Sequence, residues 1–323
     1  MPVETTEESA CSPGIQALRQ RLQGFETEAG RLKGLDFKPR ATDVFVVTSP
    51  KCGTTWLQQI VHQLRSNGNM EYDEISRVIP WLELASDQGQ DLDAPQGFEP
   101  RAFKTHACYQ HCPEGAGSKY IVVVRDPHDV AISFFSFFEG WFFQPGEVLL
   151  EEFVREFWLA RGAPASRMNN ASYFHHLTSW WPHRHREDVL FLFFEDLKED
   201  LEGAVAQVSD FIGVAHEGTE SAAAIRALAC HNSTFKFMSE HSSHFDERLS
   251  KIARNSACGL PPDAGMAGGG AKVRAGEAGK GRATLSPELR KDIDAKWEGV
   301  VGEATGCTTY QALRDRCHAE RSQ

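Results

Sequence analysis

Residues 42–56, with the sequence TDVFVVTSPKCGTTW, decide the fold class. The β-branched and aromatic run at 42–48 predicts a buried strand. Ser49, Pro50 and Gly53 end that run. Residues 55–65 (TWLQQIVHQLR) then place their aliphatic side chains on one face of a helix. The stretch therefore predicts a strand that turns sharply into a helix.

The same alternation of strand and helix recurs along the chain. Residues 101–106 (RAFKTH), 119–125 (KYIVVVR) and 188–194 (DVLFLFF) predict further strands. Helical patterns begin at Pro127 and at Leu201. Strands that alternate with longer helical segments are typical of parallel sheets with crossover helices. We therefore expect an α/β protein in which a single domain contains a central, mostly parallel sheet flanked by helices.

The domain boundaries follow from composition. Residues 1–40 read as a short helix (14–30) and a linker, residues 41–305 as the domain, and residues 306–323 as a polar tail after a final helix at 286–303. Residues 259–283 predict a flexible, Gly-rich basic loop. This loop is either a simple Gly/Ala linker or a mobile cationic flap over an anion, and the sequence leaves both readings open.

Charge and composition exclude several classes of partner. The 323 residues carry a formal net charge of −11, which disfavours a nucleic-acid partner. The apolar run VLFLFF is far too short to span a membrane, and the first residues contain no apolar segment, so we expect a cytoplasmic protein. Eight scattered cysteines predict reduced thiols. The stretch HACYQHC (106–112) lacks a second cluster with zinc-like spacing, so we expect no metal.

The turn after the first strand has the chemistry of an anion site. The first amides of a helix have no partner within the helix, and the helix dipole is positive there. Gly53 allows close backbone approach, Thr54 and Thr55 add hydroxyl donors, and Lys51 adds a charge. The lysine precedes the glycine, unlike the G-x-x-x-x-G-K-[ST] loop of nucleoside triphosphatases. Trp56 is either a core residue or a surface on which a base stacks.

These segments resemble the cytosolic sulfotransferase family over about residues 40–290. SPKCGTTW resembles the loop for the 5′ end of the donor, 3′-phosphoadenosine 5′-phosphosulfate (PAPS), and KYIVVVRDPHDVAISFFSFF resembles the segment that holds its 3′-phosphate. FKTH resembles the catalytic-histidine segment, VLFLFFEDL and STFKFM two later segments, and VRAGEAGKGR the terminal signature. The shared order of the motifs implies the P-loop NTPase-like sulfotransferase fold.

The resemblance implies PAPS as co-substrate, without a metal, and a set of residues that bind it. It places Lys51 at the leaving phosphate and the sulfonate, Trp56 on adenine, and Arg125 with Ser133 on the 3′-phosphate. Arg125 ends a predicted strand, and its alternative reading is a surface salt bridge. The remaining implied donor-binding residues are Gly53, Thr54, Thr55, Phe194, Ser233, Phe235, Met238, Arg274 and Gly276.

The resemblance also assigns the chemistry of transfer. His106 is the proposed general base, because a histidine with an ordinary pKa of about 6.5 can accept the acceptor's proton near neutral pH. Lys51 and Lys104 are expected to stabilise charge on the sulfonate and the leaving phosphate from two sides. Ser133 completes the proposed catalytic set.

Three departures from the family pattern concern donor binding rather than transfer. Phe194 replaces a usual tyrosine, which removes a hydroxyl contact of about 1 kcal/mol. Ala275 and Gly281 replace a lysine and a tryptophan of the terminal signature. The family's usual dimer motif is not recognisable, so the oligomeric state stays open. We still predict an active enzyme.

The acceptor is predicted to be a small, apolar or aromatic molecule with a hydroxyl or an amine. SRVIPWLEL (76–84) resembles a segment that lines the family's acceptor pocket and places Trp81 there. Phe138, Trp141 and Phe142 are further candidates, from an aromatic run at 133–143 that also contains ordinary core residues. Two alternatives remain: a non-catalytic protein that binds PAPS or its product 3′-phosphoadenosine 5′-phosphate (PAP), and a P-loop nucleotide kinase, which would require Mg²⁺ and turn over ATP.

Overall fold

The computed structural model describes residues 11–213, 219–266 and 279–321. Within these residues four parallel strands form one sheet in the order β2-β1-β3-β4. β1 pairs with β2 from Val44↔Ala102 onward and with β3 from Val44↔Lys119 onward. The predicted α/β architecture with a parallel sheet is thus confirmed. The strands are β1 (Val44–Thr48), β2 (Ala102–Thr105), β3 (Lys119–Val124) and β4 (Val189–Phe193).

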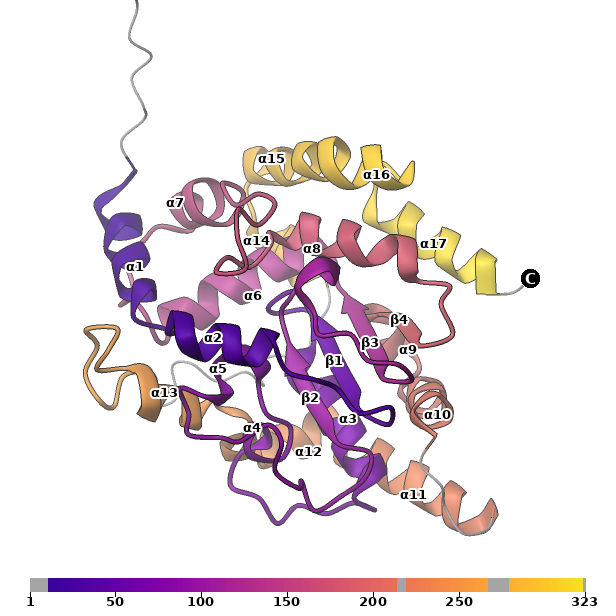
Figure 1. Cartoon of the computed structure of the whole chain (residues 1–323). Coiled ribbons are helices and arrows are strands. Elements are labelled where there is room, and N and C mark those ends of the chain that lie inside the picture. Colours follow the sequence, from indigo (N-terminus) through magenta and orange to yellow (C-terminus); the bar gives the residue numbers. More distant parts are fainter. Residues whose placement is uncertain (1–10, 214–218, 267–278, 322–323) are drawn as a thin grey trace, which may run out of the picture.

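Each strand is buried on both faces, so alternate side chains enter two different cores. Phe45 and Val47 of β1 belong to the larger core, whereas Val44 and Val46 belong to the other. The larger core contains α8 and the C-terminal helices, and the other contains α3, α10 and α11. Figure 1 shows these two groups of helices on opposite sides of the sheet.

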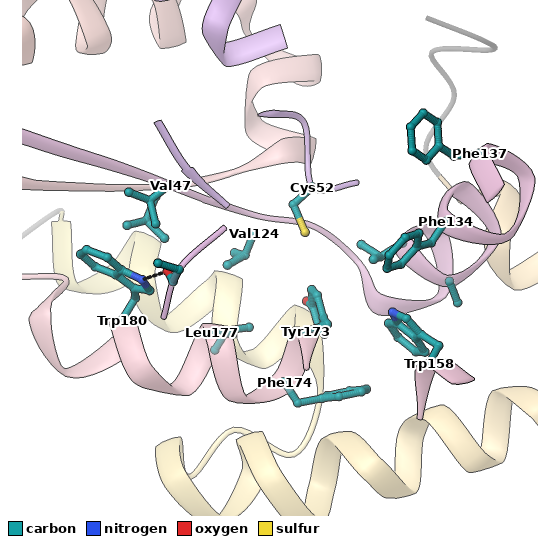
Figure 2. Packing of buried hydrophobic residues seen from close by; sticks show 14 of the residues in the cluster. Val47, Cys52, Val124, Phe134, Phe137, Trp158, Tyr173, Phe174, Leu177 and Trp180 are labelled. Carbon is teal, nitrogen blue, oxygen red and sulfur yellow. Dashed lines mark hydrogen bonds between the residues drawn. The ribbon is translucent and has the colours of Figure 1, made fainter. Parts of the chain in front are cut away.

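The helical segments up to β4 either precede β1 or lie in the connections between the strands. They are α1 (Pro13–Gln23), α2 (Glu28–Leu35), α3 (Thr54–Arg65), α4 (Ile75–Val78), α5 (Leu82–Ala85), η1 (Tyr109–His111), α6 (Pro127–Glu139), α7 (Leu150–Glu152), η2 (Phe153–Trp158), α8 (Tyr173–Trp180) and η3 (Trp181–His183). In Figure 2, Tyr173, Leu177 and Trp180 of α8 face the side of the sheet that carries Val47 and Val124. Trp180 Nε1 donates to the carbonyl oxygen of Ala107 at 3.3 Å, which fixes α8 beside the end of β2.

The chain after β4 is helical throughout its described regular structure. Its elements are α9 (Phe194–Glu199), α10 (Leu201–Ile212), α11 (Thr219–Asn232), α12 (Phe235–Glu240), η4 (Ser242–Phe245), α13 (Arg248–Arg254), α14 (Lys280–Thr284), α15 (Pro287–Trp297), η5 (Glu298–Gly302), α16 (Glu303–Thr305) and α17 (Tyr310–Arg321).

Both ends of the chain differ from the expected pattern. The helix expected at 14–30 is divided into α1 and α2, because Thr27 accepts a hydrogen bond from the Gly30 amide at 2.9 Å and starts a new helix. Within the segment read as a polar tail, Tyr310–Arg321 form α17, which buries Tyr310, Leu313 and Cys317 in the larger core. Three apolar side chains at helical spacing suffice to anchor an otherwise polar helix.

The sheet order places a ligand crevice at one edge. The chain leaves β1 toward β2 on one side and leaves β3 toward β4 on the other. The carboxyl ends of β1 and β3 therefore flank a topological switch point, where open α/β sheets bind ligands. Residues 49–53 follow β1, and Arg125 follows β3, so both lie at this edge.

Part of the basic loop falls outside the described residues. Lys272, Arg274, Ala275 and Gly276 lie there, and their predicted roles are not taken further. The residues on its far side, expected as loop, form α14 (Lys280–Thr284). All eight cysteines are free thiols. Within the described ranges, no helix has the length and apolarity to cross a bilayer, and no cluster of three or more His, Cys, Asp or Glu is placed to hold a metal.

Candidate active site

One cavity of about 1060 Å³ lies at the switch point and collects the predicted site residues. Every one of them that the structure describes lines its wall, although they come from segments spread over almost two hundred positions of the chain. What each does there remains a prediction. They are Lys51, Gly53, Thr54, Thr55, Trp56, Trp81, Lys104, His106, Arg125, Ser133, Phe138, Trp141, Phe142, Phe194, Ser233, Phe235 and Met238.

The turn between β1 and α3 has an unusual backbone. Lys51 has a φ of 72°, which a residue with a side chain adopts at a cost of about 1 kcal/mol, and Gly53 has a φ of 102°. A Cβ on Gly53 would lie 2.8 Å from the Phe194 ring. The Thr48 and Thr54 hydroxyls are 2.6 Å apart and fasten the strand end to the helix start. The turn thus holds Gly53, Thr54 and Thr55, at the start of α3, in the cavity wall.

Arg125 joins this turn to the end of β3. Its Nη1 donates to the Lys51 carbonyl oxygen at 3.4 Å, and its Nη2 lies 3.6 Å from Asp129 Oδ2. Its guanidinium carbon stacks 4.2 Å from the Phe194 ring centroid. Arg125 is therefore a half-buried cation at the sheet edge, and its ion pair with Asp129 is largely shielded from solvent.

The position of Trp56 is compatible with both of its predicted roles, a core residue and a surface on which a base stacks. It is half-buried, packs against the core of α3 and also lines the cavity. Its Nε1 donates to the Ser233 carbonyl oxygen at 2.7 Å, and Phe194 meets it edge-on at 5.3 Å between ring centroids. Met238 is buried nearby in the wall, whereas Phe235 is 45% exposed.

Two buried polar atoms in this wall are consistent with a polar ligand. Arg125 Nε and Ser233 Oγ have no hydrogen-bond partner anywhere in the described chain. Buried donors are normally satisfied, so orphans that line a cavity indicate where a ligand's acceptors fit. With Lys51 and the start of α3, they make this end of the cavity suitable for a molecule with more than one anionic group.

His106 is held in one tautomer. Its Nδ1 lies 2.7 Å from the Thr48 carbonyl oxygen. Because a carbonyl can only accept, Nδ1 must carry the hydrogen, and the neutral ring then has its basic lone pair at Nε2. Trp81 packs edge-on at 5.0 Å between ring centroids. The arrangement gives a histidine that can take a proton at Nε2.

Glu83 fixes the backbone under that histidine. Its Oε1 accepts from the His106 amide at 2.8 Å and from the Thr105 hydroxyl at 2.9 Å. The carboxylate is 1% exposed. The motif RAFKTH gives no indication of this partner, because the contact comes from α5, 23 positions earlier.

Lys104 has a buried counter-ion that the sequence did not reveal. Its Nζ lies 2.5 Å from Glu247 Oε1, and the two side chains are only 1% and 2% exposed to solvent. The Ser250 hydroxyl donates to Glu247 Oε2 at 2.7 Å, and Lys104 Nζ stacks 3.9 Å from a Trp81 ring centroid. Since 143 positions separate the pair, no local pattern could indicate it.

Asp129 ties the end of the basic loop to α6. Its two carboxylate oxygens accept from the Gly279 and Gly281 amides at 2.8 and 2.7 Å. A Cβ on Gly281 would lie 2.4 Å from the backbone of His128. The glycine at 281, a departure from the family pattern, is thus required by the close approach of α14 to α6.

The aromatic candidates form the other end of the cavity. Phe138, Trp141 and Phe142 are buried, and Trp141 Nε1 donates to Asn255 Oδ1 at 2.7 Å. Phe25, which the sequence reading missed, contacts the rings of Trp81, Trp141 and Phe142 at 5.6–5.9 Å between centroids. The segment before the domain therefore contributes to the cavity wall.

Comparison with known proteins agrees with this geometry. A family model described as Sulfotransferase domain matches residues 41–305. The chain is 31% identical over 207 residues to the amine sulfotransferase of Oryctolagus cuniculus, covering 62% of this chain and 65% of that protein. It is 33% identical over 186 residues to human sulfotransferase 1E1, covering 54% of this chain and 60% of that protein. The chain thus spans less than two thirds of these relatives' lengths.

Solved structures show the same fold. Retinol dehydratase in complex with androsterone and the inactive cofactor PAP superposes with a TM-score of 0.64 at 21% identity, over 89% of this chain and 93% of that chain. Mouse sulfotransferase SULT7A1 complexed with PAP gives a TM-score of 0.57 at 20% identity, over 85% of this chain and 90% of that chain.

Proposed function

The chain belongs to the sulfotransferase domain family, and we propose that it transfers the sulfonate group of PAPS to a hydroxyl or amine of a small, apolar acceptor. The two PAP complexes among its structural neighbours support PAPS as the donor. The name of one relative, an amine sulfotransferase, supports an amine as one of the two kinds of acceptor group.

Donor binding is assigned to the end of the cavity between β1 and β3. Lys51, Gly53, Thr54 and Thr55 would hold the 5′-phosphate at the start of α3. Arg125 and Ser133 would hold the 3′-phosphate, and Trp56 would stack on adenine. The orphaned Arg125 Nε and Ser233 Oγ supply donors for such an anion.

His106 is assigned the proton transfer. The acceptor oxygen or nitrogen attacks sulfur, the bond between sulfur and the 5′-phosphate oxygen breaks, and the acceptor's proton moves to His106 Nε2. The Thr48 carbonyl keeps Nδ1 protonated and so keeps the lone pair at Nε2. The same hydrogen bond stabilises the imidazolium that forms.

Lys51 and Lys104 are assigned the charge that develops on the sulfonate and the leaving phosphate. Lys51 lies over the Phe137 ring with its Nζ 4.0 Å from the centroid, which restrains a flexible side chain before the donor binds. Lys104 is held by Glu247, so its charge is already buried beside His106 and requires no reorganisation from water.

The observation that carries the proposal is the His106–Thr48 hydrogen bond, because it supports a base of fixed tautomer in a cavity that Lys51 and Lys104 also line. The test is incubation of the purified protein with ³⁵S-labelled PAPS and a panel of phenols, alcohols, sterols and amines, with EDTA present. Labelled product with an equivalent amount of PAP is expected. Transfer that requires Mg²⁺, or turnover of ATP instead, would contradict the proposal.

A further inference from the structure

The far wall of the cavity carries a guanidinium without a carboxylate partner. The segment after η2 lines this wall with Ala160, Arg161, Gly162 and Asn170. Arg161 Nη2 donates to the Asn170 carbonyl oxygen at 3.2 Å. No carboxylate of the described residues lies within ion-pair distance of Arg161, although the chain is acidic as a whole.

The neighbouring charges do not compensate Arg161. Glu26, which also lines the cavity, is held by two hydrogen bonds from Arg31 Nη1 at 3.0 and 2.9 Å. Arg31 Nη2 donates to the Asn170 side chain at 2.9 Å, so both guanidiniums contact this asparagine, whereas the Glu26 carboxylate pairs with Arg31 alone. Burial and the charge of Arg31 lower the pKa of Arg161 to about 10. Arg161 is therefore still cationic at neutral pH and is stabilised by any anion that enters the cavity.

An aromatic wall separates Arg161 from the proposed base. Successive ring contacts of 4.8 to 5.9 Å between centroids run from His106 to Phe157, and the Arg161 guanidinium carbon lies 6.0 Å from the Phe157 centroid. This wall suits an elongated apolar body rather than a single small ring. The rings in order are Trp81, Phe25, Phe142, Phe138 and Phe157.

We propose that the acceptor is an elongated apolar hydroxy or amino acid, whose carboxylate binds Arg161 while its hydroxyl or amine reaches His106. This inference rests on the proposed function and specifies its acceptor class. The distal carboxylate takes no part in the reaction. It contributes binding energy and sets the orientation, because a charge-assisted hydrogen bond to a guanidinium is stronger than one between neutral groups.

The test uses acceptors that differ only in that charge. Lithocholic acid and 12-hydroxydodecanoic acid are each compared with their methyl esters, at saturating ³⁵S-PAPS, in the full-length protein. The wild type is expected to show a kcat/KM about 10-fold higher or more for each acid. Arg161→Gln should bring the ratio of acid to ester close to one, and Arg161→Lys should retain part of it.

The matched control is Arg167→Gln. Arg167 belongs to the same segment but pairs with Asp36 at 2.8 Å and does not line the cavity, so the wild-type ratio is expected to persist. Thermal melts of all three variants check that each is folded.

The outcomes separate this inference from the proposed function. Equal rates for acid and ester in the wild type, or a ratio that survives Arg161→Gln, overturn the inference. Sulfonation of 2-naphthol but of neither member of each pair also overturns it, while the proposed function stands. Failure to sulfonate any compound, 2-naphthol included, removes both.

Discussion

The two ends of the cavity are built in different ways. The proposed donor end is centred on residues 50–56, Arg125 and the start of α6, which lie next to the strand ends of β1 and β3, and Phe194 and Ser233 complete its wall. The acceptor end takes Phe25, Trp81, Phe138, Arg161 and Glu247 from five separate segments. Short motifs therefore describe most of the first end, whereas Phe25, Arg161 and Glu247 of the second are defined only by the folded chain.

This difference explains why the donor is easier to infer than the acceptor. A phosphate site needs a helix start, a glycine and a cation within a few positions, so a sequence can display it whole. A pocket for an apolar molecule needs only hydrophobic surfaces at the correct distances, and many residue combinations supply these. The predictions below test whether the two ends are independent, beginning with the residue where they meet.

The largest effect is expected for His106→Ala. Loss of the base should lower kcat by about 10²–10⁴-fold, the usual contribution of general acid–base catalysis. Binding of PAP should change by less than about 2-fold, because His106 contacts the strand end and Trp81 rather than the residues assigned to the phosphates. Steady-state kinetics and calorimetric titration measure the two quantities.

The control for this variant is His185→Ala, which removes a mostly exposed histidine that does not line the cavity. It should leave both quantities unchanged. If His106→Ala kept the wild-type kcat, His106 would have no role as a base. If it weakened PAP as strongly as it lowered kcat, the two ends would not be separable.

Acid should weaken the scaffold that carries the donor end. Burial lowers the pKa of His62 on α3 and of His176 on α8 to about 3 each. Below about pH 6.5 the unfolded chain binds protons at these two histidines and the folded chain does not. The stability that they contribute is therefore fully present above that pH, and the free energy of unfolding decreases as the pH drops toward 3. Between pH 7 and pH 5 the free energy of unfolding should fall by about 2 kcal/mol for each histidine.

Urea unfolding at the two pH values measures this loss. His62→Leu should remove about half of the pH dependence attributed to this pair, whereas His185→Ala should leave it intact. A pH dependence that His62→Leu did not alter would mean that this histidine is not buried in its neutral form.

Sequence patterns predicted the scaffold well for physical reasons. The strands begin and end within a residue or two of the expected positions, because buried parallel strands are continuous apolar runs bounded by polar residues. The Thr27 cap that divides α1 from α2 and the three apolar residues of α17 are weaker local signals, and they depend on tertiary packing.

The site residues were predictable where a short motif contains them. Lys51, Gly53 and Thr54 are visible in one motif, and Asp129 lies one turn after Arg125, a spacing that could have indicated their pairing. Glu247 and Arg161 have no such signal, because their partners and neighbours in the cavity come from distant segments. Long-range contacts set these positions.

Glu247→Gln tests the buried ion pair between Lys104 and Glu247, which links β2 to the segment before α13. The change removes the negative charge that faces buried Lys104, so it should lower the free energy of unfolding by about 3 kcal/mol. Glu240→Ala, at an exposed position on α12, should change it by less than about 0.5 kcal/mol. Chemical unfolding of both variants at pH 7 gives the comparison, and equal stabilities would show that the Lys104–Glu247 pair contributes nothing.

The smallest effect is expected for Phe194→Tyr, at the donor end. Phe194 packs on Trp56 and Arg125, and a hydroxyl there restores a polar group toward the adenine region. We expect PAP to bind more tightly by about 1 kcal/mol, or about 5-fold. The acceptor KM should not change. A change in the acceptor KM without a change in PAP affinity would mean that this ring lies at the acceptor end, contrary to the proposal.

The central claim is that the cationic edge between β1 and β3 recognises a nucleotide with two phosphate positions. Calorimetric titration with PAP and with adenosine 5′-phosphate tests it most directly, since the ligands differ only in the 3′-phosphate. PAP should bind at least about 10-fold more tightly, and Arg125→Ala should remove most of that difference. Equal affinities of the wild-type protein for the two nucleotides would contradict the account.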